Sequence, residues 1–91
     1  MATKKISEGA AVVIRSLLAE IGMSQEQLAE DSGISMRTLS RRLHREHPSP
    51  FQLDELEAVA QVLGTDLVSI LISARKLATK HTAHHTGALR A

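Results

Sequence analysis

The residues best suited to recognition chemistry are arginines concentrated between positions 35 and 50. This segment contains four arginines and one glutamate, a net charge of +3. Arg37 and Arg41 lie four residues apart, so a helix would place them one turn apart on the same face. The planar guanidinium of arginine can donate two hydrogen bonds at once to O6 and N7 of guanine. Arg37 and Arg41 are therefore our main candidates for reading base edges.

A helix over residues 36–45 would turn other polar side chains toward the same partner. With Leu39 facing inward, at about 100° per residue, the outward side and its flanks hold polar side chains. They are Arg37, Ser40, Arg41 and His44. Met36 falls nearer the core, where it fits packing as well as contact with a thymine methyl group. The groups that we expect at the phosphates around this face are Thr38, Arg42, Arg45, His47 and Ser49.

Composition excludes several other kinds of site. The chain has 91 residues, no cysteine and one aromatic residue, Phe51. It therefore has the length of one small domain and lacks thiolate metal sites, disulfides and the aromatic platforms that stack single-stranded bases. The acidic residues Asp54, Glu55 and Glu57 suit the positive end of a helix dipole, and no nucleophile or phosphate-binding loop accompanies them. We therefore expect no enzymatic activity.

Histidines near the C-terminus are the main candidates for metal binding. His81, His84 and His85 would share one face of a continued helix, and imidazole is a common metal ligand. The threonines and the glycine among them disfavour a helix, however. We therefore expect residues 81–91 to form a disordered tail, with no metal and no cofactor.

Apolar residues recur at helical spacing along nearly the whole chain, without the sustained alternation that is typical of strands. This pattern predicts a compact all-α domain of five helices over residues 8–80, preceded by a flexible arm at residues 1–7. The expected helices span residues 8–21, 25–31, 36–45, 53–63 and 66–79.

Two of these helices, 25–31 and 36–45, are separated by a short turn around Gly33. Ser24-Gln-Glu-Gln27 matches a capping box, in which the serine hydroxyl accepts from a backbone N–H and the last glutamine reaches back to the cap. Glycine accepts the left-handed conformation that ends a helix, and Ser35 is placed to cap the next one. Two short helices joined by such a turn form a helix-turn-helix, whose second helix enters the DNA major groove.

Over about residues 8–78 the chain resembles the lambda-type phage repressor and Cro family of helix-turn-helix regulators. The likeness rests on Gln25, Ala29, Gly33, Ile34, Ser35, Thr38-Leu39-Ser40 and Leu63-Gly64. It implies that the partner is duplex DNA, that Ser35 and Met36 lie at base edges, and that Gln25 clamps the phosphate backbone. One departure is visible, because the family usually has an apolar residue where this chain has Arg42.

A second apolar stripe on the last expected helix indicates self-association. Val68 and Ile72 lie four residues apart, outside the core face of that helix. They would form the interface of a homodimer, or alternatively one of them would pack under the N-terminal arm. A twofold dimer places two recognition helices one DNA turn apart, about 34–36 Å, and so predicts a palindromic operator.

Together these features predict a sequence-specific double-stranded DNA-binding regulator, a phage Cro-like or minimal repressor in the bacterial host cytoplasm. Two alternatives stay open. One is an antitoxin that represses its own toxin–antitoxin genes, and the other is a helical protein-interaction module that does not bind DNA. No membrane or small-molecule partner is expected, since no apolar run approaches the roughly 20 residues that span a bilayer.

Overall fold

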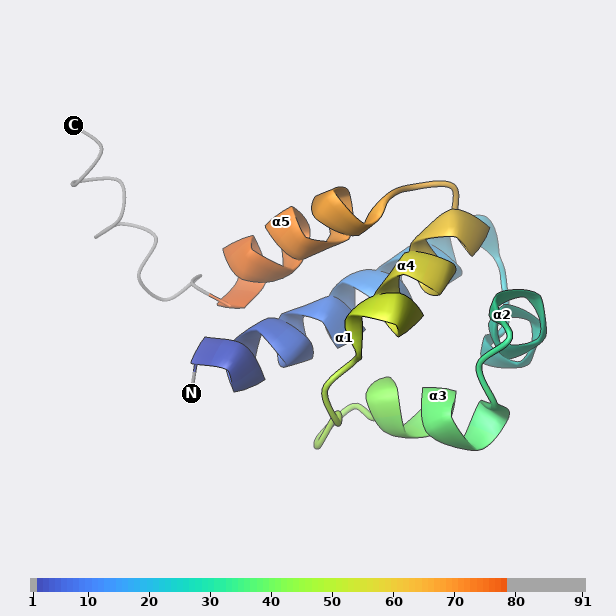
Figure 1. Cartoon of the computed structure of the whole chain (residues 1–91), viewed down its shortest axis with the longest axis horizontal. Coiled ribbons are helices and arrows are strands. Elements are labelled where there is room, and N and C mark those ends of the chain that lie inside the picture. Colours follow the sequence, from blue (N-terminus) through green and yellow to red (C-terminus); the bar gives the residue numbers. More distant parts are fainter. Residues whose placement is uncertain (1, 79–91) are drawn as a thin grey trace.

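The computed structural model describes the backbone of residues 2–78 and the side chains of residues 6–77. This part of the chain forms five helices and no strand, which confirms the all-α prediction (Figure 1). The helices are α1 (Ala2–Ile21), α2 (Gln25–Ser32), α3 (Met36–Arg42), α4 (Leu53–Val62) and α5 (Leu67–Ala78). Among them no single helix is long and apolar enough to cross a bilayer, although α4 and most of α5, bent by 107°, pass that test as a pair on length and composition.

Two helix boundaries differ from the expected ones by three residues or more. Helix α1 begins at Ala2, so residues 2–7 continue the helix instead of forming a flexible arm, and Ile6 packs against the core. Helix α3 ends at Arg42, three residues early. Asp66 caps α5, because its carboxylate accepts from the Ser69 N–H at 2.8 Å. The expected tail, with His81, His84 and His85, lies outside the described residues.

Helices α1 and α5 lie side by side and run in opposite directions (Figure 1). Their backbones approach closely at Gly9, where an added Cβ atom would clash with the Ala74 carbonyl oxygen. A helix-interior glycine costs roughly 0.5–1 kcal/mol relative to alanine, so its place here is explained by this close approach. The pair forms one side of the molecule, and α3 lies on the opposite side.

The core between these elements takes one large, fully buried side chain from every helix. These side chains are Ile14, Leu28, Leu39, Val59 and Ile70. Ile21 and Leu77, near the C-terminal ends of α1 and α5, lie at the edge of the core, since they are 51% and 40% exposed. In α1 the buried row consists of Ala10, Ala11, Ile14 and Leu18. The short helices α2 and α3 are therefore held by packing against each other and, for α2, against α4, and not by their own length.

Candidate nucleic-acid interface

The first half of the helix-turn-helix is closed at both ends by local hydrogen bonds. The Ser24 hydroxyl accepts from the Gln27 N–H at 3.0 Å, as expected of a cap. The Gln27 side chain does not return to the cap, however, because it donates to Asp31 Oδ1 at 2.9 Å. Gly33 has a φ of 80° and its N–H donates to the Ala29 carbonyl, which confirms the left-handed end of α2. These bonds therefore fix the direction in which the chain leaves α2 and enters the turn before α3.

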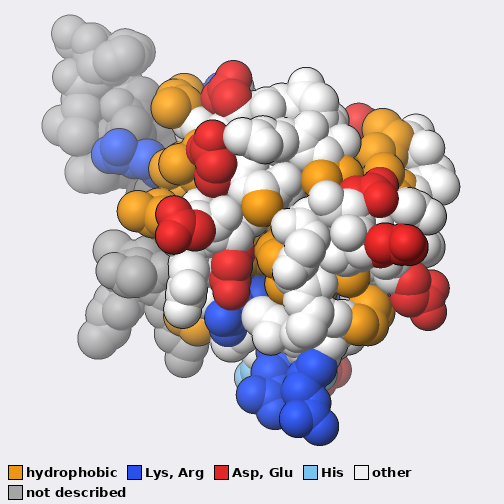
Figure 2. Space-filling model, turned by 45° about the vertical axis from the view of Figure 1, so that its right-hand side comes forward, with side chains coloured by type: hydrophobic (Ala, Val, Ile, Leu, Met, Phe, Trp, Pro, Cys, Tyr) orange, Lys and Arg blue, Asp and Glu red, His pale blue; other side chains and the backbone are white. Residues whose placement is uncertain are grey.

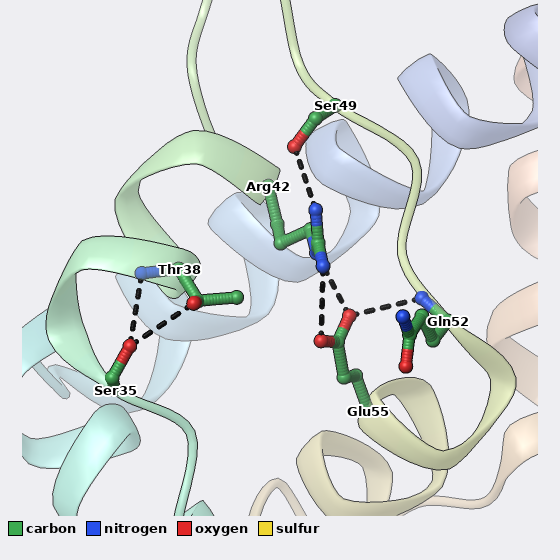
Figure 3. A network of polar contacts seen from close by, with 6 residues as sticks. All are labelled: Ser35, Thr38, Arg42, Ser49, Gln52 and Glu55. Atoms are coloured by element: carbon green, nitrogen blue, oxygen red, sulfur yellow. Dashed lines mark hydrogen bonds and ion pairs between the residues drawn. The ribbon is translucent and has the colours of Figure 1, made fainter.

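Ser35 begins α3 and is its cap, as the sequence predicts. Its hydroxyl accepts from the Thr38 N–H at 3.1 Å and donates to the Thr38 hydroxyl oxygen at 3.0 Å (Figure 3). The two hydroxyls expected at DNA thus also hold the first turn of the helix. The Thr38 proton is still available to a further acceptor.

The inward face of α3 is fixed by packing and by one long-range hydrogen bond. Leu39 and Leu43 are buried, with 0% and 2% exposure. Arg15 of α1 donates from Nη1 to the Leu43 carbonyl at 2.9 Å and so satisfies a carbonyl at the C-terminal end of α3. Burial lowers the pKa of Arg15, and the nearby charge of Arg45 lowers it further. Sequence reasoning missed Arg15, whose partner is 28 residues away.

Arg42 is paired within the protein and not left exposed for DNA (Figure 3). Its Nε and Nη2 atoms donate to the two oxygens of Glu55 at 2.8 and 3.1 Å, and its Nη1 donates to the Ser49 hydroxyl at 3.0 Å. The hydrogen bond with Glu55 raises the pKa of Arg42, and the same bond lowers the pKa of Glu55. Three of five N–H groups are thus used internally. We therefore reassign Arg42 and Ser49 from phosphate contact to internal contact.

The outward face of α3 is basic and exposed. Arg37, Ser40 and Arg41 are exposed, and no carboxylate pairs with either arginine within the described part of the chain. Figure 2 shows a protruding cluster of Lys and Arg side chains at the end of the molecule where α3 lies, with acidic side chains scattered over the rest of this view. Met36 is 38% exposed, so it is accessible to a ligand and not buried in the core.

This geometry has a counterpart among known families. Residues 13–74 match the Cro/C1-type HTH DNA-binding domain. The chain belongs to this family. Neither a curated protein nor a solved structure shows a significant match to this chain. Membership agrees with the resemblance inferred from the helix-turn-helix residues and identifies duplex DNA as the kind of partner that this domain binds.

The segment that follows α3 departs from expectation in this Cro/C1-type domain. His44 was expected on the outward face of a longer helix, but α3 ends at Arg42 and His44 Nδ1 accepts from the N–H groups of Glu46 and His47 at 3.2 and 3.0 Å. The imidazole rings of His44 and His47 stack, with their centroids 6.1 Å apart. His44 therefore stabilises the loop after α3, and the prediction that it contacts a base is wrong. Arg45 and His47 are exposed beside α3.

The ionised Glu55 side chain is expected to stabilise the Cro/C1-type domain in a pH-dependent way. Its folded-state pKa is lowered, chiefly by the hydrogen bond from Arg42, so the stabilisation is present above its ordinary value of 4.5 and is lost as the pH falls through the folded-state value. The Arg42 and Glu55 side chains are 18% and 16% exposed, so we expect their pairing to contribute about 1–2 kcal/mol to the free energy of unfolding. Urea unfolding of wild type and Glu55→Gln from about pH 7 to pH 3 measures it. The stability difference should shrink with acidification, and a constant difference would contradict this assignment.

No group of three or more His, Asp or Glu side chains among the described residues is placed to hold a metal ion. The possible metal ligands of the C-terminal tail lie beyond those residues. The candidate interface comprises α3 with its basic face, the N-terminal end of α2 and the segment that joins α3 to α4.

Proposed function

We propose that this domain is a sequence-specific transcriptional regulator that inserts α3 into the major groove of duplex DNA. One observation carries the proposal: Arg37 and Arg41 are exposed and have no carboxylate partner among residues 6–77, on a helix held from behind by the core. Such a guanidinium can bind guanine without first breaking an ion pair. Ser35, Met36 and Ser40 complete the set of residues proposed to read base edges.

Phosphate contacts are proposed to set the orientation of the domain on the duplex. Gln25 is the first residue of α2, where free backbone N–H groups favour an anion. Thr38 lies in the first turn of α3, and Arg45 and His47 lie beyond its other end. These four contacts, one from α2 and three from the first turn of α3 and the segment after it, would fix the register of α3 along the groove.

The salt dependence of duplex binding tests these phosphate contacts. Counterion release comes from cationic contacts, here chiefly Arg45, so log affinity should fall with log salt at a slope of about −1 or steeper per subunit. The variant Arg45→Ala should reduce that slope by about one, and the neighbouring Glu46→Gln should not reduce it. Equal slopes for Arg45→Ala and wild type would remove Arg45 from the proposed contacts.

Self-association through α5 is proposed to pair two recognition helices. Val68 and Ile72 are 63% and 52% exposed, four residues apart on α5. The exposure of Val68 and Ile72, with residues 2–7 continuing α1, favours an interface between copies over packing under an N-terminal arm. A twofold dimer through this stripe would bury both side chains and would bind a palindromic operator.

Ile72→Glu is expected to disrupt this dimer, because it would place a charge in an apolar interface. Sedimentation at micromolar concentration should find the wild type dimeric, free or on DNA, and the variant monomeric. The matched control is Ser69→Glu, which adds the same charge to an exposed position of α5 outside the stripe. A wild type that stays monomeric both free and on DNA would rule out the interface.

Repression by blocking polymerase, as in a phage Cro-like or minimal repressor, is the proposed mode of regulation, and no enzymatic activity is proposed. The two alternatives make different predictions. An antitoxin would co-purify with a toxin protein. A helical protein-interaction module would keep its binding partner after removal of Arg37 and Arg41.

A further inference from the structure

The contact between α3 and α4 is made by a charged pair of defined geometry. Glu55 accepts three hydrogen bonds, two from Arg42 and one from the backbone N–H of Gln52 at 2.9 Å (Figure 3). A bidentate arginine–carboxylate contact defines a plane and a direction, which an apolar contact of the same size does not. The pair therefore restricts rotation of α3 about its own axis.

The same arginine also holds the segment that follows α3. Arg42 Nη1 donates to the Ser49 hydroxyl at 3.0 Å, and the Ser49 N–H donates to the Arg41 carbonyl at 3.0 Å. Residue 49 is thus tied back to the last turn of α3 by two bonds. Arg45 and His47, which are proposed to contact phosphates, lie in the segment between α3 and Ser49. The pair therefore links the base-reading face to a phosphate-binding segment.

Small rotations matter for base reading. At a helix outer radius of about 5–6 Å, a rotation of α3 by about 20° displaces a side-chain end by about 2 Å. Hydrogen bonds between nitrogen and oxygen tolerate only a few tenths of an ångström beyond about 2.7–3.2 Å. Arg37 and Arg41 project outward from α3, so its rotation decides whether their guanidinium groups meet a base pair.

We propose that Arg42 and Glu55 are positioning residues, which hold α3 and the 44–49 segment in the arrangement that discriminates one DNA sequence from another. This inference rests on the proposed function. General affinity for duplex DNA then depends on the exposed arginines. Selectivity for one sequence depends in addition on Arg42 and Glu55, which do not contact bases themselves.

Glu55 distinguishes positioning from a simple effect of charge. Glu55→Gln removes one negative charge near a polyanion, so electrostatics alone predicts unchanged or tighter binding to every duplex. Positioning predicts weaker binding to the preferred duplex only. Glu57→Gln is the matched control, because it removes the same charge from an exposed position of α4, where the carboxylate accepts from Gln61 Nε2 at 3.3 Å.

The experiment measures the ratio of affinities for the preferred duplex and for an unrelated duplex of equal length. It is done at neutral pH and at a temperature where circular dichroism shows each variant fully folded. We expect Glu55→Gln to lower this ratio at least about fivefold, the effect of weakening one bidentate base contact, and Glu57→Gln to leave it unchanged. A smaller folded population cannot produce this result, since it lowers both affinities equally.

A second variant guards against failure to fold. Arg42→Met with Glu55→Met replaces the ion pair by an apolar pair, a change that often preserves stability. It should fold and still lose selectivity. An unchanged ratio in either variant, with a selective wild type, would overturn the positioning role alone. A wild type without any selectivity would overturn the proposed function and this inference with it.

Discussion

Replacing both Arg37 and Arg41 by alanine should weaken binding to the preferred duplex by about 1–3 kcal/mol for each guanine that an arginine binds, and relax the sequence preference. The reason is geometric, because both side chains are exposed on α3 and pair with no carboxylate of residues 6–77, while the opposite face of the helix is buried. Neither arginine contributes to the core, so the variant should keep its unfolding free energy within about 0.5 kcal/mol of wild type. Fluorescence anisotropy with labelled duplexes measures both affinities.

The control for this variant removes the same total charge elsewhere. Arg75 and Lys76 are exposed in the last turn of α5, away from α3 (Figure 1). Replacing both by alanine should change affinity for preferred and unrelated duplexes alike, with no decrease in selectivity. If the Arg37/Arg41 variant kept its selectivity, α3 would not be the base-reading element, and a protein partner would become the better account of the domain.

Leu39→Ala should have the largest effect on folding. Leu39 has 0% exposure and lies where α3 meets the core. Removing a fully buried leucine side chain costs about 2–5 kcal/mol, through reduced apolar burial and the cavity left behind. Small domains are stable by only about 5–15 kcal/mol, so the variant should lose a large share of its stability. Thermal or urea unfolding followed by circular dichroism gives the difference.

Leu53→Ala is the matched control, since Leu53 is 64% exposed and α4 begins at this residue. It should change the unfolding free energy by no more than about 0.5 kcal/mol. Similar destabilisation of the two variants would mean that α3 is not anchored through Leu39. DNA binding by Leu39→Ala should fall in proportion to the folded fraction, which separates it from the Arg37/Arg41 variant.

Features that depend on neighbouring residues could be predicted from the sequence. Gly33 and the Ser35 cap act within three or four positions of the groups they bond, and the buried Leu28 and Leu39 follow from helical spacing. The period of a helix was enough to place Arg37 and Arg41 on the outward face. The same placement was wrong for His44, because α3 ends at Arg42 and the helical angle no longer applies.

Features that depend on distant residues could not be predicted. Arg42 lies at the margin between the core and the outward face, where periodicity allows either a phosphate contact or an internal one. Its partner Glu55 is 13 residues away on another helix, and Arg15 is 28 residues from Leu43. The departure from the family at Arg42 was the one available signal, since a charged residue in place of an apolar one at a core edge requires a partner.

The most direct test of sequence-specific recognition is selection of bound sequences from a random duplex pool by the wild-type protein. Reading by α3 in a dimer predicts an enriched palindrome, whose half-sites are centred about 10–10.5 base pairs apart and contain guanines that Arg37 and Arg41 can bind. The Arg37/Arg41 double alanine variant should lose that enrichment. A pool that shows no enriched sequence with the wild-type protein would contradict sequence-specific recognition by this domain.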